Sequence, residues 1–154
     1  MRLDNLDITN GKADLGGGIN NGGGGTVTLE DSKVARNTAG AGGGIFNSTG
    51  TVMLEDSRVE RNTASGGGIY NEVGRVTLED STLRHNRAEG DGGGINNGGG
   101  TVTLEDSRVE RNTARFGGGI FNSGTGTVTL EDSTVRRNRP DNCAPPGSVP
   151  GCTG

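Results

Sequence analysis

The sequence is poor in the large side chains that fill most globular cores. Its 154 residues include no Trp, one Tyr and three Phe, and 27% of them are hydrophobic. Only when the 32 glycines are added does the apolar share reach about 45–50%, the usual range for globular domains. Such a composition disfavours a compact multilayer core and predicts a narrow, aliphatic one.

Long apolar runs and an excess of positive charge are absent too. No stretch reaches the roughly 18 apolar residues that a membrane span needs, so none is predicted. A net charge of −4 argues against a general nucleic-acid binder. The N-terminus lacks the apolar segment of a signal peptide, and the first repeat begins in mid-unit at Leu3. We therefore expect a longer natural protein with an upstream export signal.

Cysteine occurs only twice, in the Pro- and Gly-rich segment at the C-terminus. The pair Cys143 and Cys152 predicts a disulfide, and hence a secreted or cell-surface protein. Metal binding is the weaker alternative, because no His or second Cys pair accompanies these two residues. We expect two regions: repeats over residues 1–139, and a tail or cap over residues 140–154.

One short motif fills most of the chain. The heptapeptide Thr26–Ser32 recurs, with small changes, from Thr51, Arg75, Thr101 and Thr127. Between the copies stand five Gly-Gly-Gly-Ile blocks, which end at Ile19, Ile45, Ile69, Ile95 and Ile120. Both series recur every 24 to 26 residues, the signature of a solenoid built from one stacked unit. Strict recurrence of Val and Leu also argues against intrinsic disorder.

Each unit has the pattern of short strands. Val27 and Leu29 alternate with polar residues, which is the period of a half-buried strand. Turn-forming Asp31 and Ser32 end that run, and further short strands follow around Val34 and Ile45. Glycine density and β-branched residues exclude a helix. We therefore predict three short strands and three bends per unit of about 25 residues.

Such a unit can bury its few aliphatic residues only by stacking on its neighbours. The predicted fold is all-β: a single-stranded, right-handed parallel β-helix of about five turns, with equivalent residues about 4.8 Å apart. Predicted interior columns contain Val27, Leu29, Val34, Ile45 and their equivalents. Calcium rolls and hexapeptide helices need other periods, and leucine-rich repeats need more Leu residues than each unit contains. Two recurring series of Asn, from Asn37 and from Asn21, predict structural amide ladders at two of the bends.

Gly42–Ile45 together with Val34-x-x-Asn37, repeated in each unit, resembles the right-handed parallel β-helix repeat proteins of the pectin-lyase-like class. The likeness is greatest to secreted, actinobacterial-type members with a Cys/Pro-rich tail. Polymorphic outer-membrane protein repeats, which have Phe where this chain has Val or Leu, are more distantly similar. The resemblance covers nearly the whole chain. It implies the fold and says little about activity.

Enzymes of that class use acidic clusters that bind calcium, with a Lys or Arg base in a cleft. In this chain the acids are periodic, whereas catalysis needs unlike groups in one asymmetric arrangement. The lone histidine, His85, replaces the Arg of the other units and is predicted to be a surface substitution. We predict no catalytic residue and no cofactor.

Two acidic columns are nevertheless candidate metal ligands. Their members are Glu30, Glu55, Glu79, Glu105 and Glu131, each followed by an Asp. A weak calcium hypothesis concerns Glu30, Asp31, Glu55, Asp56, Glu105 and Asp106. The alternative, which we prefer, is a solvated edge whose charges pair with Lys33, Arg36, Arg58, Arg61, Arg108, Arg111 and Arg137.

Two surfaces are candidates for ligand contact. A flat threonine array is predicted from Thr26, Thr28, Thr101, Thr103, Thr127 and Thr129. It resembles ice-binding surfaces, although exposed strands favour Thr in any case. Aromatic residues follow three of the Ile residues, at Phe46, Tyr70 and Phe121, and could stack on sugar rings or cover a corner.

We therefore expect a non-catalytic extracellular β-solenoid that serves as a spacer, an adhesin or a glycan-contacting surface. A polysaccharide lyase or hydrolase is the alternative, and an ice-binding protein is a minor one. Expected partners are a polysaccharide or cell-surface glycan, and further copies of the chain through the exposed edges of the first turn.

Overall fold

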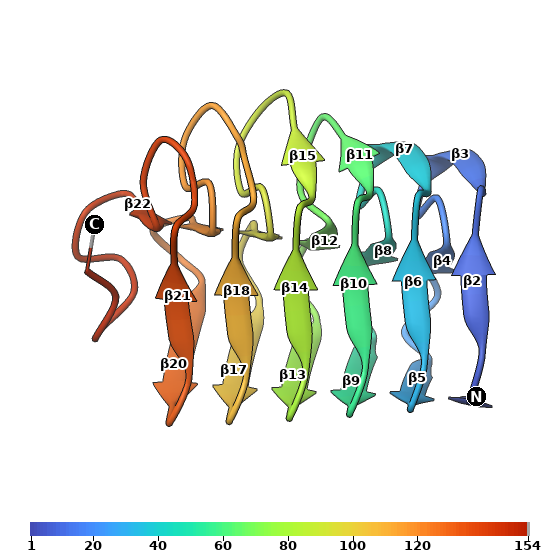
Figure 1. Cartoon of the computed structure of the whole chain (residues 1–154). Coiled ribbons are helices and arrows are strands. Elements are labelled where there is room, and N and C mark those ends of the chain that lie inside the picture. The colour runs from blue at the N-terminus through green and yellow to red at the C-terminus, as the bar shows by residue number, and fades with distance from the viewer. Residues whose placement is uncertain (154) are drawn as a thin grey trace.

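The computed structural model describes residues 1–153, and its regular elements are all β-strands. The chain winds repeatedly around one axis, and each turn lies directly beside the previous one (Figure 1). All strand pairs are parallel and join residues about one repeat apart. Among residues 1–153 there is no helix long and apolar enough to cross a membrane.

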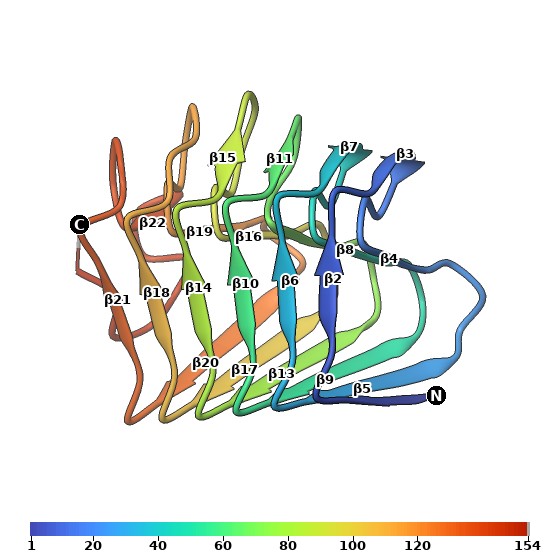
Figure 2. The ribbon, with the colours of Figure 1, turned by 45° about the vertical axis from the view of Figure 1, so that its right-hand side comes forward.

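Sheets A and B form two long faces of the solenoid (Figure 2). The strands of sheet A are β1 (Arg2–Asp4), β5 (Thr26–Glu30), β9 (Thr51–Glu55), β13 (Arg75–Glu79), β17 (Thr101–Glu105) and β20 (Thr127–Glu131). Those of sheet B are β2 (Asp7–Thr9), β6 (Lys33–Ala35), β10 (Arg58–Glu60), β14 (Thr82–Arg84), β18 (Arg108–Glu110) and β21 (Thr134–Arg136).

Sheets C and D complete each turn. Sheet C contains β3 (Lys12–Leu15), β7 (Thr38–Ala41), β11 (Thr63–Ala64) and β15 (Arg87–Ala88). Sheet D contains β4 (Ile19–Asn21), β8 (Ile45–Asn47), β12 (Ile69–Asn71), β16 (Ile95–Asn97), β19 (Ile120–Asn122) and β22 (Cys143–Ala144). In the first four turns sheet C adds a fourth short strand, where the sequence predicted three. Sheets A and B each contain six strands, one per turn, because the strands of the incomplete first turn also pair with those of the second turn.

The predicted interior columns are confirmed by the strand register. Val27 pairs with Val52 and Leu29 with Leu54, and the same alignment continues through the later turns. Val34 and Val59 are aligned likewise in sheet B, and Ile45 and Ile69 in sheet D. Most of these side chains are fully buried. Aliphatic residues one turn apart therefore form the continuous narrow core that the composition predicted.

The glycine blocks allow successive turns to touch where sheet C leads into sheet D. Gly42 has a φ of +62°, a conformation that residues with a Cβ rarely adopt. A Cβ at the next residue, Gly43, would lie 2.7 Å from the carbonyl oxygen of Thr63 in the following turn. Larger residues would push the turns apart at this corner.

Buried polar ladders occupy the other three corners. Asn62 Nδ2 donates to Asn86 Oδ1 (3.1 Å) and to the Val34 carbonyl (2.9 Å) in the two adjacent turns. Asn71 Nδ2 donates to Asn97 Oδ1 (2.9 Å) at the bend before sheet A. A third ladder joins the backbone N–H of Ser57 to Ser81 Oγ (3.0 Å). The predicted asparagine ladders are thus confirmed, and the serine ladder adds another.

The C-terminal tail folds against the last turn. Within it, β22 pairs with β19, and Val149 is buried in the core cluster. The predicted disulfide between Cys143 and Cys152 is confirmed, and both residues pack on that cluster. The tail therefore covers aliphatic residues that the last turn would otherwise leave open.

A buried ladder of this kind should contribute measurably to the free energy of unfolding. Replacing Asn71 by Ala leaves the buried Asn97 Oδ1 without its donor, and it removes one of the hydrogen bonds made by the Gly74 carbonyl and by Asn47 Nδ2. We expect the free energy of unfolding to fall by roughly 3 kcal/mol, measured by urea denaturation. The exposed Asn20 is the matched control, and Asn20→Ala should leave stability within about 0.5 kcal/mol. Equal effects of both variants would contradict a structural role for the ladder.

Candidate functional site

The predicted threonine array lies on the outer face of sheet A. Register places Thr26, Thr51, Arg75, Thr101 and Thr127 in one row and Thr28, Met53, Thr77, Thr103 and Thr129 in the next. Thr26, Thr127 and Thr129 are exposed, whereas Thr28, Thr101 and Thr103 are half-buried. Met53 and Arg75 interrupt the two rows in the middle turns, so the hydroxyl array is discontinuous.

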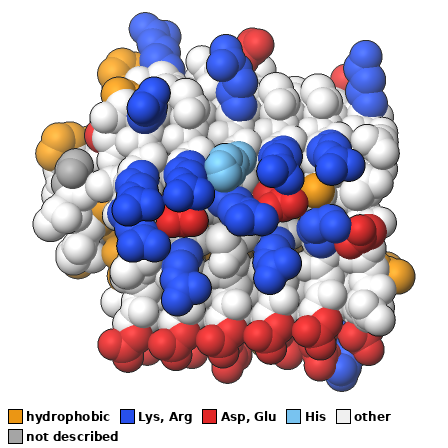
Figure 3. Space-filling view, in the orientation of Figure 1, with side chains coloured by type: hydrophobic (Ala, Val, Ile, Leu, Met, Phe, Trp, Pro, Cys, Tyr) orange, Lys and Arg blue, Asp and Glu red, His pale blue; other side chains and the backbone are white. Residues whose placement is uncertain are grey.

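The acidic columns lie side by side where sheet A turns into sheet B. Asp31 and its equivalents form a continuous acidic row along the lower edge in Figure 3. Within residues 1–153, Arg2 is the only basic side chain that pairs with either column, through Glu30. The prediction that the basic residues past the bend neutralise these columns is wrong, because they point across sheet B. Lys33, for example, pairs with Asp7 at 2.7 Å.

Calcium binding at Glu30, Asp31, Glu55, Asp56, Glu105 and Asp106 stays a prediction. In the described part of the chain, no three Asp, Glu, His or Cys side chains form a group that could hold a metal ion.

The three aromatic candidates have different surroundings in sheet D. Phe46 is only 7% exposed and stacks on Tyr70, with ring centroids 5.6 Å apart. Tyr70 and Phe121 are half-buried, and Phe121 lies between Asn96 and Ala144 of the adjacent strands. Of the two interpretations of this set, packing at a corner therefore fits Phe46, and only Tyr70 and Phe121 keep a surface open to a ligand.

The outer side of sheet B carries a strongly charged surface. Figure 3 shows a band of Lys and Arg side chains across it, well separated from the acidic row. Basic side chains come from the outward positions of the strands: Lys33, Arg58, Arg84, Arg108 and Arg136. They also come from the bend that follows each strand. We call these residues together the basic face.

The bend after sheet B holds a row of basic residues in an unusual backbone conformation. Arg36, Arg61, His85, Arg111 and Arg137 all have φ between +54° and +57°. We call these five residues the arginine row. Residues with a Cβ rarely adopt this conformation, and Asn tolerates it best. Asn10 has φ +62° at the equivalent place in the first turn. Backbone geometry therefore does not explain why the later turns have Arg.

Glu60 is the one buried carboxylate on the basic face in residues 1–153. Its side chain, in a residue 6% exposed, accepts a hydrogen bond from Arg84 Nε (2.7 Å) and pairs with Arg61 (3.3 Å). Burial alone would raise the pKa of Glu60. The hydrogen bond from Arg84 and the charges of Arg84, Arg61 and Lys33 outweigh burial, so the pKa is lowered. Glu60 is therefore ionised at neutral pH and neutralises part of the face.

His85 lies in the middle of the arginine row and is exposed. Partial burial lowers its pKa, and the charges of Arg61, Arg84 and Arg111 lower it further, against a smaller opposing effect of Glu60. At neutral pH His85 is therefore uncharged and leaves a gap in the positive row. The sequence prediction of a surface substitution agrees with this position.

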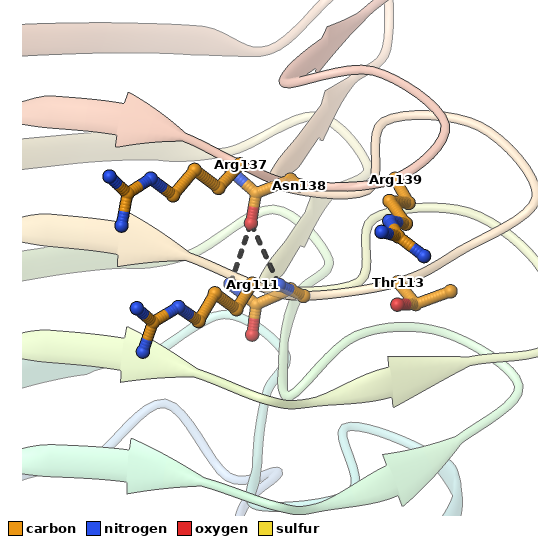
Figure 4. Close-up of a pocket in the computed structure, with 6 residues that line it drawn as sticks. Arg111, Thr113, Arg137, Asn138 and Arg139 are labelled. Carbon is orange, nitrogen blue, oxygen red and sulfur yellow. Dashed lines mark hydrogen bonds between the residues drawn. The ribbon is translucent and has the colours of Figure 1, made fainter.

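An open depression of about 630 Å³ lies at the C-terminal end of the arginine row. Its lining residues are Arg111, Asn112, Thr113, Arg137, Asn138 and Arg139. The side chains of Arg111 and Arg137 extend in the same direction, and those of Arg139 and Thr113 lie beyond the asparagine ladder (Figure 4). In residues 1–153 none of these three arginines forms an ion pair. The depression is lined by hydrogen-bond donors and contains no carboxylate.

The basic residues are evident in the sequence, but the surface that they form is not. Their recurrence one residue before each buried Asn was the available signal. The whole-chain charge of −4 concealed it, because the acidic residues gather elsewhere.

Comparison with known proteins gives one family. The sequence model of a family described as the right handed beta helix region matches residues 1–139. No curated protein and no solved structure shows a significant match.

The position of Glu60 predicts a pH dependence. Because its folded pKa is lowered, the ionised carboxylate stabilises the protein above the usual value of 4.5, and this stability is lost as pH falls through the folded pKa. We expect Glu60→Gln to be less stable than wild type at pH 7, with the difference shrinking below pH 4.5, in urea titrations. Glu89→Gln, at an exposed residue in no ion pair, is the control. A constant difference across pH would contradict the assignment.

Proposed function

The chain belongs to the right-handed β-helix family, and we propose that it is a non-catalytic extracellular module that contacts a linear glycan along its length. One observation carries this proposal: many surface positions, such as the Glu of sheet A, present the same kind of side chain at the same place in successive turns. A surface that repeats about every 4.8 Å suits a ligand that is itself a repeating chain.

The environments of the carboxylates favour a binding role over a catalytic one. General acids and bases in known sites differ in environment, so that their pKa values differ. Here the carboxylates of the two acidic columns stand in equivalent surroundings from turn to turn. The depression at Arg111 and Arg137 offers hydrogen-bond donors for an anion and no carboxylate to act as a base or nucleophile. A polysaccharide lyase or hydrolase is therefore the less supported alternative.

Secretion and a spacer or adhesin role fit the same architecture. The disulfide is compatible with an oxidising compartment. A continuous stack of paired strands also makes a stiff rod, which can hold a binding face at a distance from an anchoring point. The ice-binding alternative is less supported, because Met53 and Arg75 break the threonine rows.

A glycan array combined with a degradation assay tests the proposal. We expect binding to linear polysaccharides and no change in their chain length, read as new reducing ends or unsaturated products. Appearance of such products would favour the lyase or hydrolase. Absence of binding to every glycan, neutral or charged, would overturn the proposal.

A further inference from the structure

We propose that the basic face binds a linear sulfated polysaccharide, which lies along the solenoid axis over the arginine row. This inference rests on the proposed glycan-contacting function and specifies the face and the class of ligand. It is carried by the residues chosen in the row, by their spacing and by the lack of ion pairs at Arg36, Arg111 and Arg137 in residues 1–153.

The choice of residue is the first argument. Positive φ is unfavourable for Arg at each of these positions. Asn would fit the backbone better, as Asn10 does in the first turn. Four arginines nevertheless stand in the equivalent positions of later turns: Arg36, Arg61, Arg111 and Arg137. Backbone strain retained in successive turns indicates that the guanidinium groups themselves are needed.

Spacing is the second argument. Equivalent residues stand one strand apart along the axis, about 4.8 Å, because the strands before them are in register. Figure 4 shows that Arg111 and Arg137 extend in parallel. A row of parallel guanidinium groups matches a polymer that carries anionic groups at intervals along an extended chain.

Unused hydrogen-bond capacity is the third argument. Within residues 1–153, Arg36, Arg111 and Arg137 form no ion pair with any carboxylate. Guanidinium groups bind sulfate oxygens through paired N–H donors. Arg139 and Thr113 add donors on the other side of the depression. In Figure 4 the guanidinium groups of Arg111 and Arg137 extend away from Arg139 and Thr113, so the parallel pair itself offers the paired donors for one sulfate group.

The residues of the basic face favour a sulfated polysaccharide over a nucleic acid. Proteins that bind single strands place aromatic rings under the bases. The strands of sheet B and the arginine row contain no Phe, Tyr or Trp, and the stacked pair Phe46 and Tyr70 lies in sheet D. A polyanion held by its charges alone fits such a surface better than one held by its bases.

Paired charge variants test the proposal against dextran sulfate, with uncharged dextran as the matched polymer. We expect dextran sulfate to bind wild type in titration calorimetry at low salt, and Arg111→Gln/Arg137→Gln to weaken binding by about ten-fold or more. Arg75→Gln, at an exposed arginine on sheet A, should change affinity less than about two-fold. Urea denaturation of each variant shows whether it is folded.

Two further variants give readouts that misfolding would not mimic. Glu60→Gln should strengthen binding several-fold, because it frees Arg84 and Arg61 from a buried carboxylate. Sulfate groups keep their charge over the accessible pH range. Lowering pH from 8 to 5.5 should therefore strengthen binding to wild type more than to His85→Gln, because the bound polyanion offsets the repulsion from Arg61, Arg84 and Arg111 and favours protonated His85.

The outcomes distinguish this inference from the function on which it rests. Binding of neutral glycans without binding of dextran sulfate overturns the inference and leaves the proposed function standing. Equal losses for Arg75→Gln and the double variant overturn the assignment to this face. Single-stranded DNA that binds as tightly as dextran sulfate, with the same dependence on Arg111 and Arg137, replaces the glycan by a nucleic acid.

Discussion

The buried ladders of Asn and Ser, which hold each turn directly beside its neighbours, are the interaction on which the rest of the structure depends. Backbone hydrogen bonds alone would allow strands to slip. A slip would separate Asn62 from Asn86 and leave buried amide groups unpaired. Aliphatic residues are interchangeable between turns and specify register weakly, whereas the amides specify it strongly. Polar groups inside a narrow core therefore fix the geometry that the aliphatic residues then fill.

Because successive turns are in register, a local sequence pattern becomes a property of a whole face of the solenoid. Because equivalent residues of successive turns lie side by side, each charged position becomes a column of charges. Adjacent charges of the same sign, about 4.8 Å apart, repel by roughly 0.9 kcal/mol in water. The Asp column keeps this repulsion low by staying exposed to solvent, whereas the Glu column is in part half-buried. On the basic face, Glu60 and Glu110 reduce it through Arg84 and Arg136. The arginine row beyond them is neutralised only in part, by Glu60 through Arg61.

The interior could be predicted from the sequence, because columns such as Val27 and Val52 follow directly from the repeat period. The pairing of charges could not. Lys33 and Arg58 come close in sequence to Asp31 and Asp56, but the bend between sheets A and B directs them over another face. The positive φ of the arginine row carries no local signal, because sequence preference favours Asn or Gly there. Burial of Phe46 depends on its stacking partner in the next turn.

Net charge describes a compact protein poorly when its charges are sorted by face. Screening at physiological salt limits the reach of an exposed charge to about 8 Å, which is less than two turns of this solenoid. A ligand over sheet B is therefore influenced mainly by the residues beneath it, and those are basic (Figure 3). The acidic row then influences the orientation of a polyanion more than its affinity, because it repels the chain from one edge. Columns of opposite sign on neighbouring corners thus define a track parallel to the axis.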